Sequence, residues 1–437
     1  MIGRLQELEG KLRARDAEIA VIGLGYVGLP LALHFAEAGF RVTGIDIDKE
    51  KIAALRAGRS YIGDVPAQQV RKLVDAKAFT ATAEFTDLSR ADCINICVPT
   101  PLRQTKDPDI SFILSAVREV RMRLRSGQLI VLGSTTYPGT THELYLPILA
   151  ESGLRVGTDF ALAFAPERID PANKAFAFKD VPKVVGGETA VCTQLAAEMF
   201  RAIFERVVVV SSSQAAEMTK LLENTFRMIN IGLANEVAMM CDRLGLDVWE
   251  IISAAATKPY GFMKFTPGPG LGGHCIPVDP AYLSWKLRSL NFSARFIELA
   301  SEINANMPEW VVERVVRLLN RERRAVNGSK ILLMGMAYKA DVGDVRESHA
   351  LDIFGKLEEL GADVRYHDPY VSDVEIAGRE HQSVALDDKA LDVLDLIVIT
   401  TDHRSVDYAA LCKRGVRVLD TRNATGPLGK LENVERL

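Results

Sequence analysis

Short apolar runs alternate with helical patterns through the first half of the chain. Glu18 to Gly23 is such a run, a helical pattern from about Val27 to Ala38 follows, and Arg41 to Asp46 is a second run. A strand, a helix and a strand within about thirty residues form a βαβ unit. Further strands are predicted at 93–98, 129–134, 161–165 and 207–210, with helices at 113–124 and 191–204. This alternation predicts a Rossmann-like, doubly wound parallel sheet.

The segment before this unit, residues 1 to 17, is polar and is expected to be a helix or ragged extension outside the first domain. The pattern changes again after Gln214. From Gln214 to Leu244 there is no proline, and the single glycine, Gly232, does not interrupt the helical spacing of the apolar residues. Such a helix would be roughly 45 Å long, so we expect it to link domains and to pack against a partner.

A central helical part follows from the same kind of pattern. A second helix is predicted at 248–256, then a loop rich in glycine and proline at 259–280. A helical stretch runs from about 296 to 319, and Pro308 is placed to break it. The polar residues 320–329 mark a boundary.

The βαβ pattern then returns. A strand and small-residue turn at 330–337, a helix at 349–360 and a strand at 363–368 ending in aspartate resemble the first unit. Gly335 and Ala337 stand where the first unit has Gly23 and Gly25, and the helix begins later. We therefore predict two Rossmann-like domains joined by a central helical domain with a long helix. The predicted boundaries are 1–210, 211–322 and 323–437.

Charge and cysteine content indicate which kinds of partner and which cellular compartment to expect. Of 437 residues, 53 are basic and 57 acidic, a net charge of −4, and there is no long basic run, so nucleic acid and anionic membrane are not expected partners. The six cysteines form no CxxC pair, and five are expected to be buried free thiols. No metal site is expected. Without an apolar leader or an 18-residue apolar span, the protein is expected to be cytoplasmic.

A dinucleotide fingerprint opens the first helix. Gly23-Leu-Gly25-Tyr26-Val27-Gly28 follows a predicted strand. Gly23 permits the tight turn, Gly25 lets the backbone approach a pyrophosphate, and Gly28 lets helix and strand pack closely. The phosphates would lie on the helix N-terminus. Asp46 ends the next strand, where a carboxylate meets ribose hydroxyls and repels a 2′-phosphate, so NAD is favoured over NADP. The alternative is a tight turn without a ligand.

Hydroxyl groups and a carboxylate follow three other predicted strands. Pro99 and Thr100 lie in Val98-Pro-Thr-Pro101, Ser134 and Thr135 begin Ser134-Thr-Thr-Tyr-Pro-Gly139, and Glu167 lies in Ala165-Pro-Glu-Arg168. The carboxyl ends of parallel strands share one edge of a sheet, where ligands bind. The hydroxyls could touch cofactor, substrate or water, although ordinary turn chemistry explains them as well. Glu167 is a possible base or water-positioning group.

The most informative segment is Gly270-Leu-Gly-Gly-His-Cys-Ile-Pro-Val-Asp279. Cys275 follows Gly272 and Gly273, which allow a ligand close to the backbone, and its thiolate could attack an aldehyde while Asp279 handles protons. The alternatives are a buried thiol and a helix cap.

On the long helix, Lys220 and Asn224 are four residues apart and share a face. Together they could bind an alkoxide or a polarised carbonyl. A solvated helix face is the alternative.

Taken together, these motifs resemble those of the UDP-glucose/GDP-mannose dehydrogenase family, from about Glu18 to Asn423. The resemblance adds Ala216-Glu-Met-Thr-Lys-Leu-Leu-Glu-Asn224 and Gly335-Met-Ala-Tyr-Lys339 with Asp344-Val-Arg-Glu-Ser348. It implies an enzyme that uses two NAD to oxidise the C6 alcohol of a nucleotide sugar to a carboxylate. The product would be a precursor of a surface polysaccharide. It also implies a homodimer, or a higher homo-oligomer, formed through the long helix.

The resemblance further implies roles for individual residues. Cys275 would be the nucleophile, Lys220 and Asn224 the oxyanion-stabilising pair, and Asp279, through a water, the base. Glu167 and Thr135 would serve hydrolysis. Besides the fingerprint, cofactor contacts are expected from Pro99, Thr100, Ser134, Thr135 and Arg346. Substrate contacts are expected from Glu167, Arg168, Lys220, Asn224, Gly272, Gly273 and Lys339.

Departures from the family pattern bear on the sugar. Ile169-Asp-Pro171 replaces a stretch in which some members carry a second glutamate, and Val278 stands where UDP-glucose dehydrogenases often have lysine. The run Cys275 to Pro280, with Tyr282 to Lys286 and Phe296 to Ala300, is more similar to the UDP-N-acetylglucosamine 6-dehydrogenase branch. The alternatives are UDP-glucose or another N-acetylhexosamine as substrate, a single-oxidation hydroxyacid dehydrogenase, or a non-catalytic nucleotide-sugar sensor.

Overall fold

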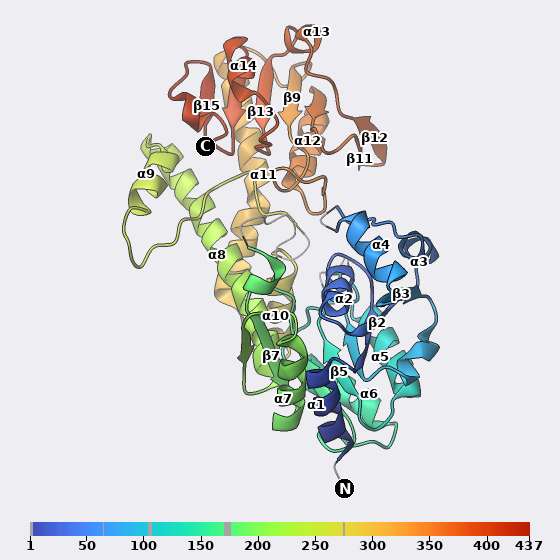
Figure 1. Ribbon diagram of the computed structural model, residues 1–437. Helices are drawn as coiled ribbons and strands as arrows, with labels where there is room; N and C mark the ends of the chain where they lie inside the picture. Colours follow the sequence, from blue (N-terminus) through green and yellow to red (C-terminus); the bar gives the residue numbers. More distant parts are fainter. Residues whose placement is uncertain (1–2, 64, 104–106, 170–175, 274–275) are drawn as a thin grey trace. The chain divides into compact units, whose positions relative to one another are not determined.

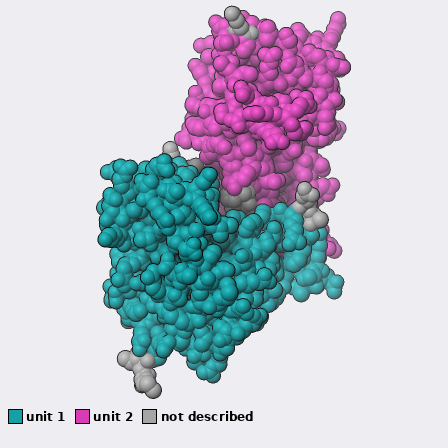
Figure 2. Space-filling model, turned by 90° about the vertical axis from the view of Figure 1, so that its right-hand side faces the viewer, with its two compact units in different colours: residues 1–223, 285–291 teal, residues 224–284, 292–437 magenta. Residues whose placement is uncertain are grey.

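The computed structural model describes residues 3–63, 65–103, 107–169, 176–273 and 276–437 (Figure 1). The chain divides into two compact units (Figure 2). Unit 1 comprises residues 1–223 and 285–291, and unit 2 comprises 224–284 and 292–437. The division into three domains at 210 and 322 stays a prediction.

An eight-stranded sheet forms unit 1, in the order β3-β2-β1-β4-β5-β6-β7-β8. Its strands are β1 (Glu18–Ile22), β2 (Arg41–Ile45), β3 (Phe79–Thr82), β4 (Cys93–Ile96), β5 (Leu129–Leu132), β6 (Ala161–Phe164), β7 (Lys183–Gly187) and β8 (Val207–Val209). The first six follow the doubly wound order, which confirms the predicted Rossmann-like fold. Strand β7, which was not predicted, runs antiparallel to β6, with Ala163 opposite Gly187, whereas the other neighbouring strands of this sheet run parallel.

Helices cover both faces of this sheet (Figure 1). They are α2 (Gly28–Glu37), α3 (Lys49–Arg56), α4 (Ala67–Asp75), α5 (Ser111–Arg123), α6 (Leu146–Ala150) and α7 (Ala190–Phe200). Along β1, Ile19 and Val21 enter one core cluster while Ala20 and Ile22 enter the other. Burial on both faces explains why the strand is a continuous apolar run rather than an alternating one.

The N-terminal segment belongs to this core, contrary to the prediction of an extension outside it. Helix α1 (Arg4–Ala14) buries Leu5, Leu8 and Leu12 in the same cluster as α7. The three leucines are spaced by three and four residues and so form one helical stripe. Because the other residues of the segment are mostly polar, its overall composition indicates an exposed segment and not a buried helix face.

Helix α8 (Ser213–Leu244) is 32 residues long and confirms the predicted long helix. It is followed by α9 (Val248–Ala255), α10 (Asp279–Arg288) and α11 (Arg295–Arg321). Within unit 2, α8 and α11 pack closely: a Cβ on Gly232 would lie 3.2 Å from Ala300 Cβ, and Asn235 Nδ2 donates to Asn304 Oδ1 at 2.8 Å.

The predicted break at Pro308 does not occur, because α11 continues through it. Met307 and Val311 on either side are fully buried. Packing of this face outweighs the single hydrogen bond that proline removes from a helix.

A five-stranded parallel sheet forms the far part of unit 2, in the order β10-β9-β13-β14-β15. Its strands are β9 (Lys330–Met334), β10 (Asp363–His367), β13 (Leu396–Ile399), β14 (Arg417–Asp420) and β15 (Val434–Arg436). Helices α12 (His349–Glu359), α13 (Asp388–Leu391) and α14 (Tyr408–Lys413) accompany it, with the hairpin β11 (Asp373–Ile376) and β12 (Arg379–Gln382). This is the other common doubly wound order and confirms the second α/β domain.

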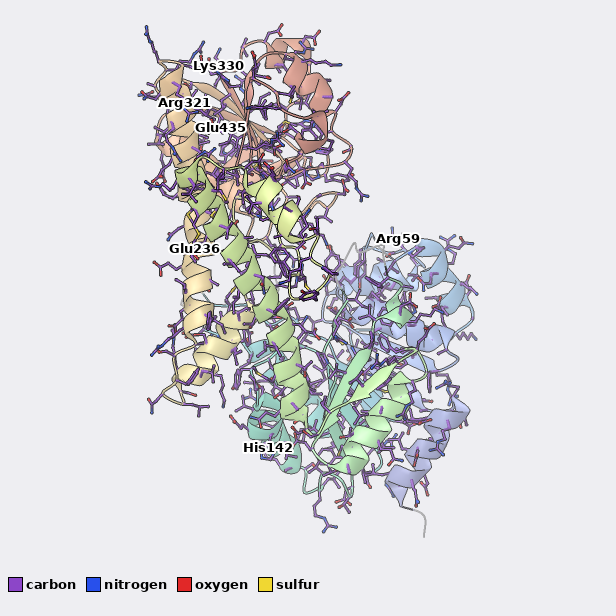
Figure 3. All side chains as sticks on the ribbon, turned by 90° about the vertical axis from the view of Figure 1, so that its left-hand side faces the viewer. Arg59, His142, Glu236, Arg321, Lys330 and Glu435 are labelled. Carbon is purple, nitrogen blue, oxygen red and sulfur yellow. The ribbon has the colours of Figure 1, made fainter. Side chains whose placement is uncertain are left out.

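A buried ion network joins α8, α11 and β15. Arg314, almost fully buried, donates to Asp242 at 2.7 Å and to Glu435 at 2.6 Å. Arg321 binds the second oxygen of Glu435 at 2.6 Å (Figure 3). The network fixes the end of the second sheet against the central helices of unit 2.

Two further findings concern the whole described chain. Its five described cysteines, residues 93, 97, 192, 241 and 412, are buried free thiols, as predicted. Within the described residues, no helix is both long and apolar enough to cross a bilayer.

Candidate active site

The glycine-rich turn between β1 and α2 has the shape that a dinucleotide requires. Gly23 adopts a φ of +89°, and a Cβ on Gly28 would lie 1.8 Å from the carbonyl oxygen of Gly23. Neither position accepts a side chain. A Cβ on Gly25 would meet no atom within 4 Å, so the space in front of this backbone is open. An open, side-chain-free backbone at the start of a helix fits the close approach of a pyrophosphate.

Asp46 braces this turn from the end of β2. Its carboxylate accepts hydrogen bonds from Leu24 N at 2.8 Å and Asp48 N at 3.0 Å, and Lys51 Nζ lies 3.9 Å away. The aspartate that was expected to contact the ribose therefore also holds the glycine-rich turn. The ribose contact stays a prediction.

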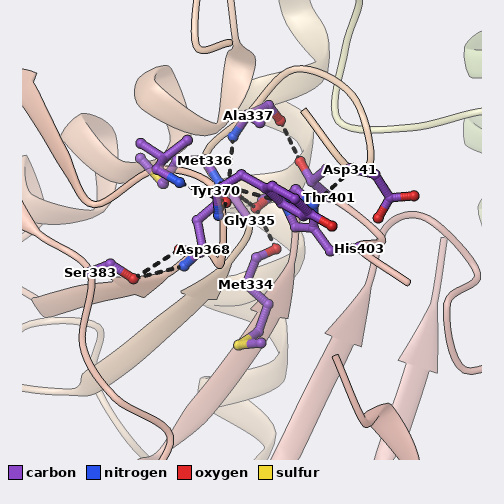
Figure 4. A network of polar contacts seen from close by, with 12 residues as sticks. Met334, Gly335, Met336, Ala337, Asp341, Asp368, Tyr370, Ser383, Thr401 and His403 are labelled. Atoms are coloured by element: carbon purple, nitrogen blue, oxygen red, sulfur yellow. Dashed lines mark hydrogen bonds and ion pairs between the residues drawn. The ribbon is translucent and has the colours of Figure 1, made fainter. Parts of the chain in front are cut away.

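The equivalent aspartate of unit 2, Asp368, is shielded from solvent. Asp368 accepts from Met336 N at 2.7 Å and Ala337 N at 3.0 Å, which repeats the arrangement at Asp46 (Figure 4). Buried His403 lies against it, with Nε2 3.0 Å from Oδ2. His403 Nδ1 accepts from Asp341 N, so Nε2 carries the proton. The repeated fold thus keeps the bracing aspartate but leaves its carboxylate inaccessible.

The hydroxyl-bearing loops lie at the carboxyl ends of β4 and β5, as predicted. Ser134 is buried, and its hydroxyl donates to Val98 O at 2.8 Å, which ties the two loops together. Thr135 and Thr100 are half-buried, whereas Pro99 is exposed. This hydrogen bond joins two separate loops rather than closing a local turn, and the ligand contact of Ser134 stays a prediction. In the glycine-rich turn, Tyr26 is exposed and Val27 half-buried.

Glu167 follows β6 at the same edge. Its Oε1 accepts from Arg168 N and Ile169 N, both at 2.8 Å, and its Oε2 lies 3.3 Å from Lys183 Nζ. Arg168 points elsewhere: its guanidinium donates to Pro182 O at 2.5 Å and pairs with Glu223 at 2.6 Å. Glu167 is thus a fixed carboxylate with a buried cation beside it.

Lys220 and Asn224 lie on one buried face of α8, so the solvated-face alternative was wrong. Lys220 is 9% exposed and Asn224 6% exposed. One turn earlier, fully buried Glu217 accepts from Gly139 N at 2.6 Å, Thr141 N at 2.9 Å and Thr141 Oγ1 at 2.6 Å. Burial raises the pKa of Glu217 to about 7, against the effect of these donors. Glu217 anchors this face of α8 to the segment after β5.

In unit 2, Asn224 meets Asp279 although they are 55 positions apart. Asn224 Nδ2 donates to Asp279 Oδ2 at 2.5 Å, and Asp279, 3% exposed, is the first residue of α10. An amide donor and a carboxylate acceptor are thus paired in a buried place. Cys275, the predicted nucleophile, lies outside the described residues.

The glycines before Cys275 pack so closely against the second α/β domain that no side chain would fit there. A Cβ on Gly270 would lie 1.9 Å from His349 Cδ2, and one on Gly272 would lie 2.6 Å from Tyr338 Cβ. Gly273 has a φ of +95°, and its N–H donates to Arg346 O at 3.2 Å. These glycines are required by protein packing, in addition to any ligand.

Arg346 and Lys339 belong to the loop after β9 that receives these glycines. The exposed Arg346 guanidinium makes a bidentate pair with Asp344, at 2.9 and 2.6 Å, so Asp344 orients the expected cofactor contact. Lys339 is half-buried. Both roles stay predictions.

Two buried charged residues in unit 1 were missed by the sequence analysis. Glu217 was visible only as part of a helix motif, and its helical spacing with Lys220 and Asn224 was the available signal. Lys183 had no signal, because its place at the ligand edge depends on the reversed direction of β7.

Models of one protein family match most of the chain. The NAD binding domain of the UDP-glucose/GDP-mannose dehydrogenase family matches residues 17–206, the central domain matches 214–306 and the UDP binding domain matches 332–427.

Individual relatives agree with these matches. A UDP-N-acetyl-D-glucosamine 6-dehydrogenase of Pseudomonas aeruginosa is 36% identical over 360 residues, covering 82% of this chain and 84% of that protein. A UDP-N-acetyl-D-mannosamine dehydrogenase of Pyrococcus horikoshii is 34% identical over 414 residues, covering 93% and 95%. A solved UDP-D-ManNAc dehydrogenase of the same organism has a TM-score of 0.86 at 34% identity and covers 96% of this chain and 98% of its own. The chain therefore belongs to the UDP-glucose/GDP-mannose dehydrogenase family and is an NAD-dependent UDP-sugar dehydrogenase, an oxidoreductase.

Proposed function

We propose that the protein oxidises the C6 alcohol of a UDP-N-acetylhexosamine, UDP-N-acetylglucosamine in the first place, to the uronic acid for surface polysaccharide synthesis. The observation that carries this proposal is the buried hydrogen bond from Asn224 Nδ2 to Asp279 Oδ2, at 2.5 Å. In the sequence, Asp279 ends the motif that contains Cys275. An amide and a carboxylate held together in a buried place are the groups that a bound alcohol and its oxyanion require.

The first oxidation begins at the alcohol. Asp279 accepts the hydroxyl proton through a water. The hydrogen on C6 leaves with the electron pair of its bond, as a hydride, and the aldehyde forms. Lys220 and Asn224 stabilise the developing negative charge on oxygen, and each such donor is typically worth about 3 kcal/mol. No hydrogen bond or ion pair within the described residues occupies the Lys220 ammonium, which supports this role. NAD held on the glycine-rich turn at Gly23, Gly25 and Gly28 would supply the hydride acceptor for each of the two oxidations.

The second oxidation goes through Cys275. Its sulfur adds to the aldehyde carbon to give a thiohemiacetal, and loss of a second hydride and a proton gives a thioester. Water then adds to the acyl carbon, the carbon–sulfur bond breaks, and the carboxylate and free thiol are released. Glu167 and Thr135 handle this water. The covalent step keeps a reactive aldehyde from escaping.

The remaining site residues bind the two ligands. NAD would lie on Gly23, Gly25, Tyr26, Val27 and Gly28 with Asp46 at the ribose, and Pro99, Thr100, Ser134, Thr135 and Arg346 would add further contacts. The UDP-sugar would be held by Glu167, Arg168, Lys220, Asn224, Gly272, Gly273 and Lys339. The open space at Gly25 supports the first assignment.

The N-acetylglucosamine assignment rests on relatives and on the motif around residues 275–280. The Pseudomonas aeruginosa relative is a UDP-N-acetyl-D-glucosamine 6-dehydrogenase, whereas the Pyrococcus horikoshii relative is a UDP-N-acetyl-D-mannosamine dehydrogenase. The second candidate substrate is therefore UDP-N-acetylmannosamine, which differs only in configuration at C2.

We also propose a homodimer through α8. In unit 2 this helix exposes Phe226, Leu233 and Met240, each about half exposed. A spacing of seven residues keeps them on one face, and a row of large exposed apolar side chains is typical of an interface. Sedimentation of the native protein and of Leu233→Glu tests this: the variant should run as a monomer.

Purified protein with NAD and a panel of UDP-sugars tests the activity. We expect two NADH per UDP-N-acetylglucosamine consumed, a uronic acid product, and slower turnover with UDP-glucose. Cys275→Ala should form no acid. Two NADH per sugar from Cys275→Ala would refute the covalent mechanism, and one NADH per sugar from the native protein would favour a single-oxidation dehydrogenase.

A further inference from the structure

A buried lysine lies at the ligand edge of the first sheet. Lys183 begins β7, and because β7 runs antiparallel to β6, this first residue lies where the parallel strands end. The side chain is 3% exposed, and its ammonium lies 3.3 Å from Glu167 Oε2. The reversed strand thus brings a positive charge to the carboxylate at the end of β6.

Packing alone does not require a charge at this position. The Lys183 ammonium lies 5.1 Å from the ring centre of Phe200 and 5.4 Å from that of Phe204. Both distances lie within cation–π range, so the rings stabilise the ammonium, although replacing a buried ion pair by apolar side chains is often neutral or stabilising. The rings do not account for the contact of the ammonium with a carboxylate at the ligand edge, which is Glu167.

Glu167 is fixed from both sides. Its Oε1 accepts two backbone N–H groups at 2.8 Å, and Oε2 faces Lys183. Its side chain is 13% exposed, so a single cation at this distance interacts with it strongly. These contacts hold the carboxylate in one orientation.

Other titratable groups around the pair leave Lys183 as its main counter-charge. His34 of α2 lies near Glu167, and burial lowers the pKa of His34, although Glu37 opposes this. Burial raises the pKa of Cys97 to about 12, so this thiol is neutral at physiological pH. Arg168 is paired with Glu223.

We propose that Lys183 is a positioning residue whose positive charge orients Glu167 to accept the proton of the water that hydrolyses the acyl intermediate. In this step Glu167 takes one proton, the hydroxide adds to the acyl carbon, and the sulfur leaves with the electron pair of the broken bond. The inference rests on the proposed function, because only a covalent acyl route has this hydrolysis.

The test is the pH dependence of acyl hydrolysis in Lys183→Met. Removal of the positive charge beside the proton acceptor should make acyl hydrolysis more sensitive to acid, so that its acid limb moves to higher pH. Intact-protein mass after rapid acid quench, with NAD and UDP-N-acetylglucosamine, should show an acyl adduct that accumulates at low pH and clears about tenfold more slowly there. The affinity for NAD should be unchanged.

Matched variants separate charge from structure. Lys183→Arg should restore the native profile. Lys179→Met removes a surface lysine that pairs with Glu205 at 2.9 Å, and should leave the profile unchanged. In a Glu167→Gln background, Lys183→Met should cause no further shift.

The possible failures are distinguishable. Two NADH per sugar with the same acid limb in Lys183→Met as in the native protein would overturn the role of Lys183 and leave the proposed function standing. One NADH per sugar from the native protein would remove both. Failure of both Lys183→Met and Lys183→Gln to fold would also overturn the inference, because the lysine would then be a packing requirement.

Discussion

Replacing Gly272 by alanine should reduce turnover sharply without abolishing the fold. Gly272 does not have a positive φ, so its backbone accepts alanine. The obstacle is space: the added Cβ would lie 2.6 Å from Tyr338 Cβ and 2.8 Å from Glu347 O. Neither is the free end of a flexible side chain, so the loop itself must move.

The size of the movement follows from these contacts. Ordinary carbon contacts begin near 3.4 Å, so the loop would shift by about 0.8 Å. Asp279, which follows Gly272 in the chain and begins α10, would be displaced with it. A misplacement of about 1 Å near the reacting atoms can lower the rate about a hundredfold, whereas overpacking destabilises by about 1–3 kcal/mol. We expect about a hundredfold lower kcat with the protein still folded.

The assay is initial NADH formation with saturating NAD and UDP-N-acetylglucosamine, with urea unfolding alongside. Gly355→Ala is the matched control in the same unit: Gly355 lies inside α12, and its Cβ would meet Ile376 Cγ2 at an ordinary 3.8 Å. It should keep native kcat and gain about 0.5–1 kcal/mol of stability. Native kcat in Gly272→Ala would refute the steric reasoning.

Three further predictions follow from single contacts. Without ligand, Gly25→Ala should have the same unfolding temperature as the native protein. It should bind NAD at least about tenfold more weakly, because its Cβ enters open space that the pyrophosphate would use. The pKa of Glu217 is raised to about 7 in the folded protein, so its stabilising contribution is fully present below about pH 4.5 and is lost as pH rises through 7. Relative to Glu217→Gln, native stability in urea should therefore fall by up to about 3 kcal/mol over this range. Arg314→Ala should lower the free energy of unfolding by about 3–5 kcal/mol, because Asp242 and Glu435 lose their buried partner.

Each of the three has a result that would contradict it. For Gly25, calorimetric titration with native NAD affinity would rule out the phosphate contact. For Glu217, a stability difference independent of pH would mean that its carboxylate ionises normally. For Arg314, a loss of stability no larger than that caused by Lys179→Ala, which removes an exposed lysine, would show that the network is not buried in solution.

Local patterns in the sequence were enough for the regular elements that bury continuous apolar surface. The run from Glu18 to Ile22 predicted β1 because both faces of a central parallel strand are covered. The helical spacing from Gln214 to Leu244 predicted α8 to within one residue. The order of strand, glycines, helix and aspartate predicted the nucleotide turn, since each glycine there answers a local steric need.

Predictions failed where distant contacts overrode a local rule. Pro308 should break a helix, but the packing of α11 on its neighbours holds it continuous. Polar residues 4–14 looked external, but three leucines reach the core. β7 was not predicted at all, because Lys183 to Gly187 is short and glycine-ended and its direction is a property of the sheet.

The sequence by itself determined the types of chemistry: glycines for phosphates, a thiol, a lysine with an amide, and carboxylates at strand ends, because a motif states which side chains are present and in what order. Only the tertiary structure decided which of these groups meet. It paired Asn224 with Asp279, buried Glu217 under the loop after β5, and brought Lys183 to Glu167 by reversing one strand. The reason is physical: hydrogen bonds and charge effects act over a few ångströms, and the distances between residues far apart in the chain are set by packing and strand direction, which no local pattern encodes.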